Sequence, residues 1–567
     1  MKIVFTLLSI IMVALFWDAG FHIIRGLLNL FPVLIWFAFL LIVANSWFFS
    51  TVAISSIVAV LYSLSSLKLK VWHQPITPAD LHYLKSIGDL RGVFETYTNP
   101  YIVAGIVLAF LSLIVWYYRK KVDKERDRFL RYPRNGRGLF QRLLVIAAIS
   151  AVLAVWIGQV IDYKSPLHRI YHDFSVKHGV SRLKWSLKEN GFFTYFITQL
   201  PLFEIQIPSF DMTRGSVRLS PVIRGKADGP SVLPDIIVWV NESTFDPSYL
   251  NFDYPGLRSF SMFQEHPATI ASGLLNVHAF GGRTWITEFG FFAGIPPYIF
   301  GPSGSCAPYT LVPRLKEALG THLRSKGYRT VAFNPVSGRF MDAASAYKHY
   351  GFDEFYDPQK LGHNDPHSWH IPDEFFKEQT IRLIQGHAGP MPLFLVVLTM
   401  GNHGPHPQKN GPERTSFQGP GLTANTAQAL SAYLARLQET DKAIEALSLY
   451  LMGRARPTIF LYFGDHLPAF TDEMPDELFD TTRGADKMKT TFHIRTNYPV
   501  ERPMVPQILD VSYLSGLLLD VARLNDSPFF QFNAFMRNYL QGKMIMQGNP
   551  DLYVNSYVAQ MVNQITQ

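Results

Sequence analysis

A long uncharged segment near the amino terminus constrains the fold more than any other feature of the sequence. Residues 26–67 contain no Asp, Glu, Lys or Arg over 42 positions, enough for two membrane spans of ~20 residues each. Three further uncharged stretches, 3–17, 101–118 and 143–161, each fit one span. The sequence therefore predicts a transmembrane domain of five helices in residues 1–161. For 3–17 the alternative is a cleaved signal peptide, which the single preceding basic residue, Lys2, disfavours.

The orientation of these spans follows from the basic residues between the last two of them. Residues 119–142 carry ten Lys or Arg against three Asp or Glu, so the positive-inside rule makes this loop cytoplasmic. Alternating spans then place everything after Asp162 outside the membrane. The net charge of +8 comes almost entirely from this loop, so it does not indicate a nucleic-acid partner.

The chain after the spans is predicted to form a linker and one large outer domain. Residues 162–230 have scattered basic and aromatic residues followed by a polar, glycine-containing stretch, which indicates a juxtamembrane linker. Residues 231–567 form the expected outer domain. Its single cysteine, Cys306, excludes an intramolecular disulfide, but a domain of ~350 residues buries enough surface to fold without one.

Four short apolar runs in the outer domain each end in a polar cluster. Their length and their content of β-branched and aromatic residues are typical of buried parallel strands, and helix-like stretches separate them. This order predicts an α/β domain with a mainly parallel central sheet that binds ligands at the carboxyl ends of its strands. The runs are 236–240, 330–333, 393–400 and 458–463, and the helix-like stretches include 312–327 and 425–451.

The polar residues that follow three of these runs are of metal-binding type. Glu242, His403, Asp465 and His466 are expected at one edge of the sheet, and carboxylates with imidazoles are ligands of divalent metals. Each residue alone has a simpler interpretation, since Glu242 could cap a helix and Asp465–His466 could be a polar turn. Their recurrence at several strand ends favours a shared metal site.

An isolated hydroxyl, Thr284, follows Gly281, Gly282 and Arg283 and opens a predicted helix over 284–292. A nearby cation would make this hydroxyl a competent nucleophile, and the amide groups of a helix N-terminus would receive an anion. The alternative is that Thr284 is the N-cap of the helix. The residues themselves leave both interpretations open.

The motifs VNES, GGRTWITEF, TMGNHGPH and YFGDHLPAF, in this order after the spans, resemble the lipoteichoic acid synthase and phosphoglycerol transferase group of the alkaline phosphatase superfamily. The resemblance implies a sulfatase-like fold in which Glu242, Thr284, Asp465 and His466 bind one divalent metal ion, with Mn or Mg favoured over Zn. It also implies that Thr284 is the nucleophile. His403 would contact the substrate phosphate or assist the leaving group.

The activity implied by this resemblance is transfer of a phosphoglycerol headgroup. The donor would be a membrane phospholipid, with phosphatidylglycerol favoured, and the acceptor a cell-envelope glycan or glycolipid. The resemblance further implies a bacterial plasma membrane protein with an extracytoplasmic catalytic domain. Phosphoethanolamine transferases remain an alternative, although their common type carries many cysteines. A phosphodiesterase or sulfatase-type hydrolase is the other, but sulfatases have a modified Cys or Ser where this chain has Thr284.

The expected headgroup pocket departs from the family pattern. The family draws a His, a Trp and an Arg from the segment before YKHYGFDEFYD, and Asn334, Met341 and Ala343 stand at those positions here. The candidate substrate-binding residues are therefore Arg283, Asn334, Arg339 and His403, although Arg283 could also be structural.

Three histidines, His363, His367 and His370, lie within eight residues of HNDPHSWH. They could form a second metal site or line the acceptor cleft. Their spacing fits no compact ligand motif, so an ordinary loop is the preferred interpretation.

Overall fold

The computed structural model describes most of the chain, which divides into two compact units, Met1–Glu204 and Ile205–Gln567. The described residues are 22–72, 136–176, 183–203, 232–252, 260–365, 368–387, 389–406, 421–544 and 551–566, with short pieces at 9, 12–15, 18–20, 75–78, 80, 128–130, 205–207, 230 and 257. Residues 162–204, which we expected in a linker, cluster with the first unit.

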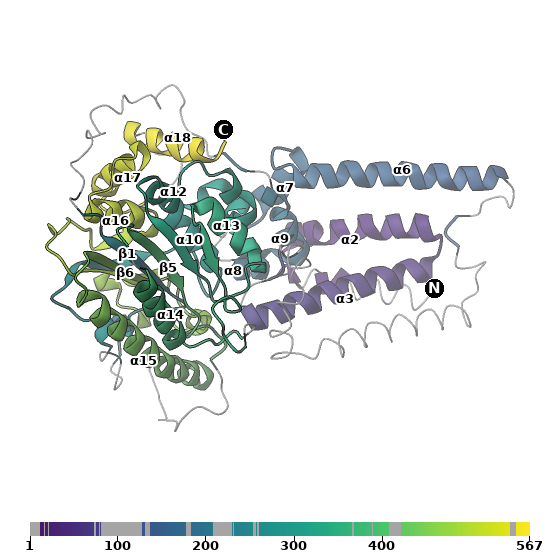
Figure 1. The fold of residues 1–567 in the computed structure, drawn as a ribbon. Helices are drawn as coiled ribbons and strands as arrows, with labels where there is room; N and C mark the ends of the chain where they lie inside the picture. The colour runs from purple at the N-terminus through teal and green to yellow at the C-terminus, as the bar shows by residue number, and fades with distance from the viewer. Residues whose placement is uncertain are drawn as a thin grey trace. The chain divides into compact units, whose positions relative to one another are not determined.

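The first unit is helical in its described part (Figure 1). Three of its helices are long and apolar enough to cross a membrane, at Ile23–Ala44, Trp47–Ser66 and Gly136–Ile161. They agree with three of the five expected spans, whereas 101–118 and most of 3–17 lie outside the described residues. The helices are α2 (Ile23–Ala44), α3 (Trp47–Trp72), α6 (Gly136–Ile161), α7 (Pro166–Phe174), α8 (Leu183–Asn190) and α9 (Phe192–Thr198).

The second unit is built on an eight-stranded mixed sheet with the order β4-β3-β5-β1-β6-β7-β2-β8. The four predicted runs are confirmed as β1, β3, β5 and β6, and they are parallel neighbours at the centre of the sheet. Among the described strands, only β7 is antiparallel to both of its neighbours, β6 and β2. The strands are β1 (Asp235–Asn241), β2 (Thr269–Asn276), β3 (Arg329–Phe333), β4 (Glu354–Tyr356), β5 (Leu393–Leu398), β6 (Thr458–Gly464), β7 (Lys489–Thr496) and β8 (Ile508–Asp510).

Helices cover both faces of this sheet, because alternate side chains of the buried strands point to opposite sides. In β1, Val238 packs in one core cluster and Trp239 in the other. The first cluster includes residues of α10, α12, α13 and α16 to α18, and the second lies under α14 and α15 (Figure 1). The helices are α10 (Thr284–Ala293), α11 (Ala307–Thr310), α12 (Leu319–Ser325), α13 (Ala343–Tyr350), α14 (Asp373–Gly386), α15 (Ala424–Met452), α16 (Leu514–Ala522), α17 (Pro528–Tyr539) and α18 (Leu552–Thr566).

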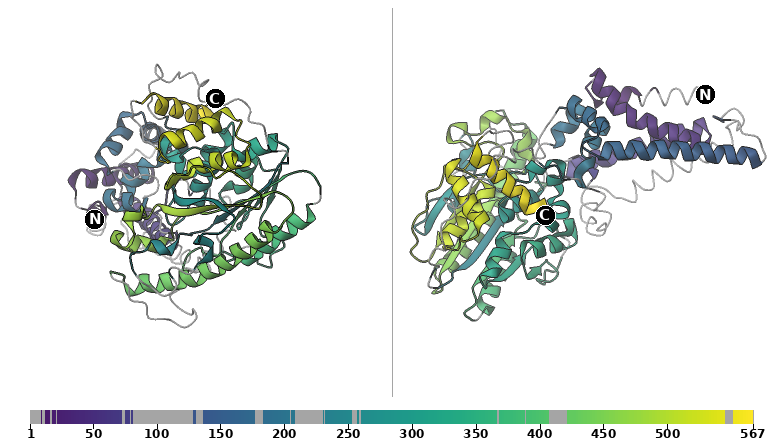
Figure 2. Two further views of the ribbon diagram at one scale, coloured as in Figure 1. Left: turned by 90° about the vertical axis from the view of Figure 1, so that its left-hand side faces the viewer. Right: turned by 90° about the horizontal axis from the view of Figure 1, so that it is seen from above.

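The longest helix of the second unit, α15, confirms the helix expected over 425–451 and runs along one side of the unit in both Figure 1 and the left-hand view of Figure 2. The stretch 312–327 is only partly helical, with a 3-10 turn at Val312–Arg314 before α12. Cys306, the single cysteine of the chain, is buried.

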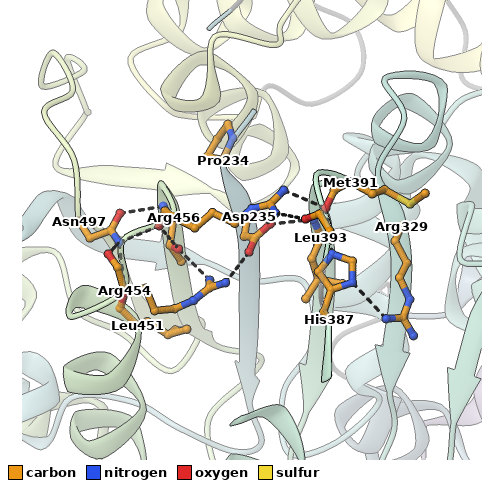
Figure 3. Close-up of polar contacts among 12 residues, drawn as sticks. Pro234, Asp235, Arg329, His387, Met391, Leu393, Leu451, Arg454, Arg456 and Asn497 are labelled. Atoms are coloured by element: carbon orange, nitrogen blue, oxygen red, sulfur yellow. Dashed lines mark hydrogen bonds and ion pairs between the residues drawn. The ribbon is translucent and has the colours of Figure 1, made fainter. Parts of the chain in front are cut away.

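The amino-terminal end of the central strands is closed by an ion-pair network around Asp235, the first residue of β1 (Figure 3). Arg454 Nη2 lies 2.7 Å from Asp235 Oδ2, and Arg456 Nε lies 2.9 Å from Asp235 Oδ1. The amide of Leu393, at the start of β5, also donates to Oδ1 at 2.9 Å. This buried carboxylate is therefore fully paired and joins β1, β5 and the segment before β6.

Candidate active site

Glu242, Asp465 and His466 meet at the carboxyl ends of β1 and β6. The two strands pair in parallel with Asn241 opposite Gly464, so the next residues, Glu242 and Asp465, come side by side. All three side chains are buried, and their ligand-type atoms lie within 4.8 Å of one another. Within the described part of the chain, this is the group of acidic and histidine residues that could hold a metal ion.

The hydrogen bonds of this cluster leave an unsatisfied set of acceptors. His466 Nδ1 lies 3.0 Å from the carbonyl of Leu467, so Nδ1 carries the proton and the Nε2 lone pair faces the carboxylates. Nε2 is 3.2 Å from Asp465 Oδ2 and 3.6 Å from Glu242 Oε1. Asp465 Oδ2 and His466 Nε2 are buried, and neither has a hydrogen-bond partner among the residues that the structure describes. Acceptors that face one another without a donor fit a divalent cation, and two carboxylates with one imidazole suit Mn, Mg or Zn.

The pKa shifts of Asp465 and His466 also indicate that this cluster needs a cation. Burial, followed by the nearby Glu242 carboxylate, raises the pKa of Asp465 well above its ordinary value. Burial lowers the pKa of His466; the Glu242 carboxylate opposes this shift, and the neighbouring His403 and Arg283 add to it. The imidazole is therefore neutral at pH 7 and offers the carboxylates no positive charge. A bound divalent ion would keep both of them ionised.

The remaining contacts hold these ligands rigidly. Asp465 Oδ1 accepts from the amides of Ser243 and His466, both at 2.7 Å. The Ser243 hydroxyl donates to Glu242 Oε1 at 2.6 Å. Ser243 belongs to the VNES motif, but nothing in the sequence alone assigns it a contact with the cluster.

Thr284 is brought to the same cluster by α10. Its Oγ1 donates to Glu242 Oε2 at 3.2 Å. The helix begins at Thr284 as expected, but its N-cap is Arg283, with a left-handed φ of 68°. The interpretation of Thr284 as the N-cap is therefore wrong, since its hydroxyl donates to a carboxylate. The Thr287 hydroxyl donates to the Asp465 carbonyl at 2.7 Å and fixes α10 against the end of β6.

Two glycines make the turn before α10 possible. Gly281 has φ 64° and Gly282 has φ 137°, both in the region that favours glycine. A Cβ on Gly281 would also lie 3.1 Å from Ala469, in the loop after β6. The GGRT sequence thus brings the Thr284 hydroxyl close to the ligands after β6.

Asn334 lies in a buried network beneath α10. It is 2% exposed, and its Oδ1 accepts from the amide of Val336 at 3.1 Å. Tyr347 donates a short hydrogen bond to Glu288 Oε1 on α10, and burial, followed by this carboxylate, raises the pKa of Tyr347 well above its ordinary value, with Asn334 opposing the shift. Burial raises the pKa of Glu288 to about 7, with a smaller contribution from Glu242. Asn334 is therefore adjacent to Tyr347, the residue that contacts α10, and it lies in the protein interior.

His403 lies in the loop after β5, next to the cluster. It is half-buried, packs against Trp369 with ring centroids 5.2 Å apart, and lowers the pKa of His466 by its charge. Arg283 is 6% exposed and acts on His466 in the same way. Arg339 is exposed. The structure thus brings Arg283 and His403 near the metal-type cluster.

The histidine-rich loop shows no metal-type grouping in its described residues. His363 Nδ1 lies 2.8 Å from the Asp365 carbonyl, and its ring packs against Phe375. His370 is exposed, and His367 lies outside the described residues. The helix that follows this loop is α14, with Pro372 as its N-cap and Asp373 and Glu374 in its first turn.

Comparisons with known proteins match the outer unit to one family and to several relatives. Residues 234–505 match the family model described as Sulfatase. An "Uncharacterized protein" of Haemophilus influenzae is 33% identical over 351 residues, covering 60% of this chain and 63% of that protein. A "Putative cyclic beta-1,2-glucan modification protein" of Rhizobium meliloti is 26% identical over 403 residues, covering 70% of this chain and 59% of that protein. The chain thus spans less than two thirds of the length of either relative.

Solved structures show a more distant similarity. The phosphoglycerol transferase GacH of Streptococcus pyogenes, in complex with sn-glycerol-1-phosphate, is 18% identical with a TM-score of 0.48, covering 64% of this chain and 95% of that one. The family match accordingly rests on sequence: residues 234–505, slightly less than half of the chain, are similar to the Sulfatase family, and they contain the motifs from which we expected a sulfatase-like fold.

Proposed function

We propose that the chain is a membrane-anchored, metal-dependent phosphotransferase that moves a phosphoglycerol headgroup from a membrane phospholipid, by way of Thr284, to a cell-envelope glycan or glycolipid. One observation carries the proposal: the Thr284 hydroxyl is hydrogen-bonded to Glu242 in a buried cluster whose Asp465 Oδ2 and His466 Nε2 atoms have no hydrogen-bond partner among the described residues. The three apolar helices of the first unit support access to a lipid donor. The glucan-modification name of the Rhizobium meliloti relative supports a glycan acceptor.

The residues of this chain would act in a definite order. Glu242, Asp465, His466 and Thr284 would hold the metal ion. When bound, the ion would favour ionisation of the hydroxyl and neutralise charge on the phosphoryl group. The Thr284 oxygen, ionised by loss of its proton to solvent, attacks phosphorus while the bond from phosphorus to the diacylglycerol oxygen breaks, and it departs again in ionised form in the second step. His403 gives the diacylglycerol oxygen its proton, and in the second step it takes the proton of the acceptor hydroxyl that releases Thr284.

Two positive groups support this order of events. The amides at the start of α10 and the Arg283 side chain, which directly precedes this helix, would hold the phosphoryl group at Thr284. His403, on a different loop, would face the departing oxygen.

Headgroup-labelled phosphatidylglycerol and phosphatidylethanolamine, supplied separately to membranes containing the protein, test the proposal. We expect a phosphoglycerol adduct at position 284, detected by mass spectrometry, that a chelator abolishes. Thr284→Ala should lose the adduct, whereas Thr284→Ser should retain it because a hydroxyl remains. An adduct only from phosphatidylethanolamine would reassign the donor. Labelling that persists in Thr284→Ala would overturn the mechanism, and diacylglycerol release without an adduct would indicate direct hydrolysis.

A further inference from the structure

One face of α15 contacts both loops that carry the proposed chemistry. Tyr433, Arg436 and Thr440 are spaced by three and four residues, so they lie on the same side of this helix. Tyr433 and Thr440 are at most 1% exposed. The two loops they reach are 242–245, after β1, and 401–406, after β5. These loops carry Glu242 and His403.

A directional chain of hydrogen bonds runs from α14 through α15 to Glu242. The Thr440 hydroxyl donates to Asp373 Oδ2 at 2.7 Å and accepts from Asn402 Nδ2 at 3.0 Å. The same Nδ2 donates to Thr244 Oγ1 at 3.0 Å, and Thr244 donates to the Glu242 carbonyl at 2.8 Å. Each hydroxyl has a single proton, so the donors can be arranged in only one way.

The amide of Asn402 connects the two loops. It is adjacent to His403 in sequence, and it is bonded to Thr244, two residues after Glu242. Its orientation leaves Asn402 Oδ1 buried with no hydrogen-bond partner in the described structure. A buried acceptor without a donor costs free energy. The two bonds made by Nδ2 therefore outweigh that cost and fix the amide.

The other two residues of this face hold the backbone of the loops. Arg436 donates from Nη1 to the His403 carbonyl at 2.7 Å and from Nη2 to the Pro405 carbonyl at 3.3 Å. Tyr433 accepts from the Phe245 amide at 3.3 Å and stacks on the Phe245 ring at 5.6 Å. Loop 401–406 is thus fixed by Arg436, and loop 242–245 by Tyr433.

We infer that this face of α15 is a positioning element, which sets His403 at a fixed place relative to the Glu242–Thr284 pair through Thr440 and Asn402. The inference rests on the proposed function, because it assigns His403 and Thr284 to one reaction. Apolar packing would hold the loops together without fixing their orientation, whereas a buried polar chain has one arrangement. Thr440 touches no reacting atom, so it acts through Asn402.

A matched pair of substitutions at Thr440 tests the inference in the full-length, manganese-loaded protein. Thr440→Val keeps the shape and removes the hydroxyl, and Thr440→Ser keeps the hydroxyl. With bis(p-nitrophenyl) phosphate as the probe, we expect kcat of Thr440→Val to fall about tenfold or more, because small displacements of reacting groups are costly. KM and manganese affinity should change less than about threefold, and Thr440→Ser should stay within about threefold of wild type in kcat.

Rates are taken per folded molecule, so a loss of stability alone does not lower kcat. Equal kcat for wild type and Thr440→Val would overturn the inference and leave the proposed function intact. So would a parallel loss of kcat and manganese affinity, since the hydroxyl would then serve the metal ligands only. A wild-type protein that neither turns over the probe nor forms the adduct at position 284 would instead overturn the proposed function, and the inference with it.

Discussion

The two ends of β1 each carry a buried carboxylate, and they are satisfied in opposite ways. At the amino end, Asp235 has two arginines and a backbone amide as partners (Figure 3). At the carboxyl end, Glu242 and Asp465 have His466 as their ion-pair partner among the described residues, and that imidazole is neutral at pH 7. The amino end of β1 thus carries a carboxylate whose charge is balanced by arginines, whereas the carboxylates at its carboxyl end still require a cation.

This difference separates structural from functional carboxylates. Burying charge is favourable only with full compensation. Asp235 is compensated within the chain, so the amino end needs nothing from outside. The carboxyl end is compensated only by a ligand, which is consistent with ligand binding at the carboxyl ends of strands in α/β sheets.

The largest expected effect on the free energy of unfolding comes from a substitution at the amino end of β1. Asp235→Asn removes the charge that pairs with Arg454 and Arg456 and should lower the free energy of unfolding by about 3 kcal/mol. Denaturant unfolding of the full chain would measure it. Glu439→Gln, which breaks an exposed pair with Lys442, should cost less than about 0.5 kcal/mol.

Manganese affinity of the folded Asp235→Asn protein should be unchanged. A loss of affinity as large as that of a ligand substitution would show that the two ends of β1 are not independent.

The second substitution, in the cluster at the carboxyl end of β1, should stabilise the metal-free protein, whereas Asp235→Asn destabilises it. Asp465→Asn should raise the free energy of unfolding of the metal-free protein by about 1–2 kcal/mol, because it removes repulsion from Glu242 and gives His466 Nε2, at 3.2 Å, a donor. Its Oδ1 still accepts from the two backbone amides. Metal affinity should fall by about 100-fold or more, measured by titration after chelation. A destabilised metal-free variant would make Asp465 a structural residue like Asp235.

The contrast also shows what the sequence could and could not predict. The four central strands were predictable because they are uniformly apolar runs, and their parallel order brings Glu242, Asp465 and His466 together without further information. The strands β2, β4, β7 and β8 were missed. In β7, the buried Arg495 interrupts the apolar pattern, and only the fold shows that Glu445 and Ser448 of α15 are its partners.

The roles of α15 could not be predicted for the same reason. Tyr433, Arg436 and Thr440 look like ordinary residues of an amphipathic helix, and their function depends on loops more than 25 residues away in sequence. Asp235 is a further case, because an acidic residue that begins a strand gives no sign of the two arginines that follow α15.

A third buried carboxylate, Asp373, is compensated less fully than Asp235 and more fully than the Glu242–Asp465 pair. Its substitution has the smallest expected effect on the free energy of unfolding. Its described partners are neutral, namely the Gly401 amide at 3.0 Å and the Thr440 hydroxyl at 2.7 Å. Burial raises its pKa to about 6, and Glu242 adds to the shift. In the unfolded chain its pKa is about 3.9, so between these values the folded protein binds more protons.

The free energy of unfolding should therefore rise as the pH falls through about 6, and the stabilisation from Asp373 should be lost as the pH rises through that value. Between pH 7 and pH 5 the gain from this group is about 1 kcal/mol. Asp373→Asn lacks the titrating group, whereas all other groups are common to both proteins. The stability difference between wild type and variant should thus shift by this amount in favour of wild type at pH 5. An unchanged difference would mean that Asp373 is already ionised at pH 5, and that neutral donors compensate a buried carboxylate as well as the two arginines of Asp235 do.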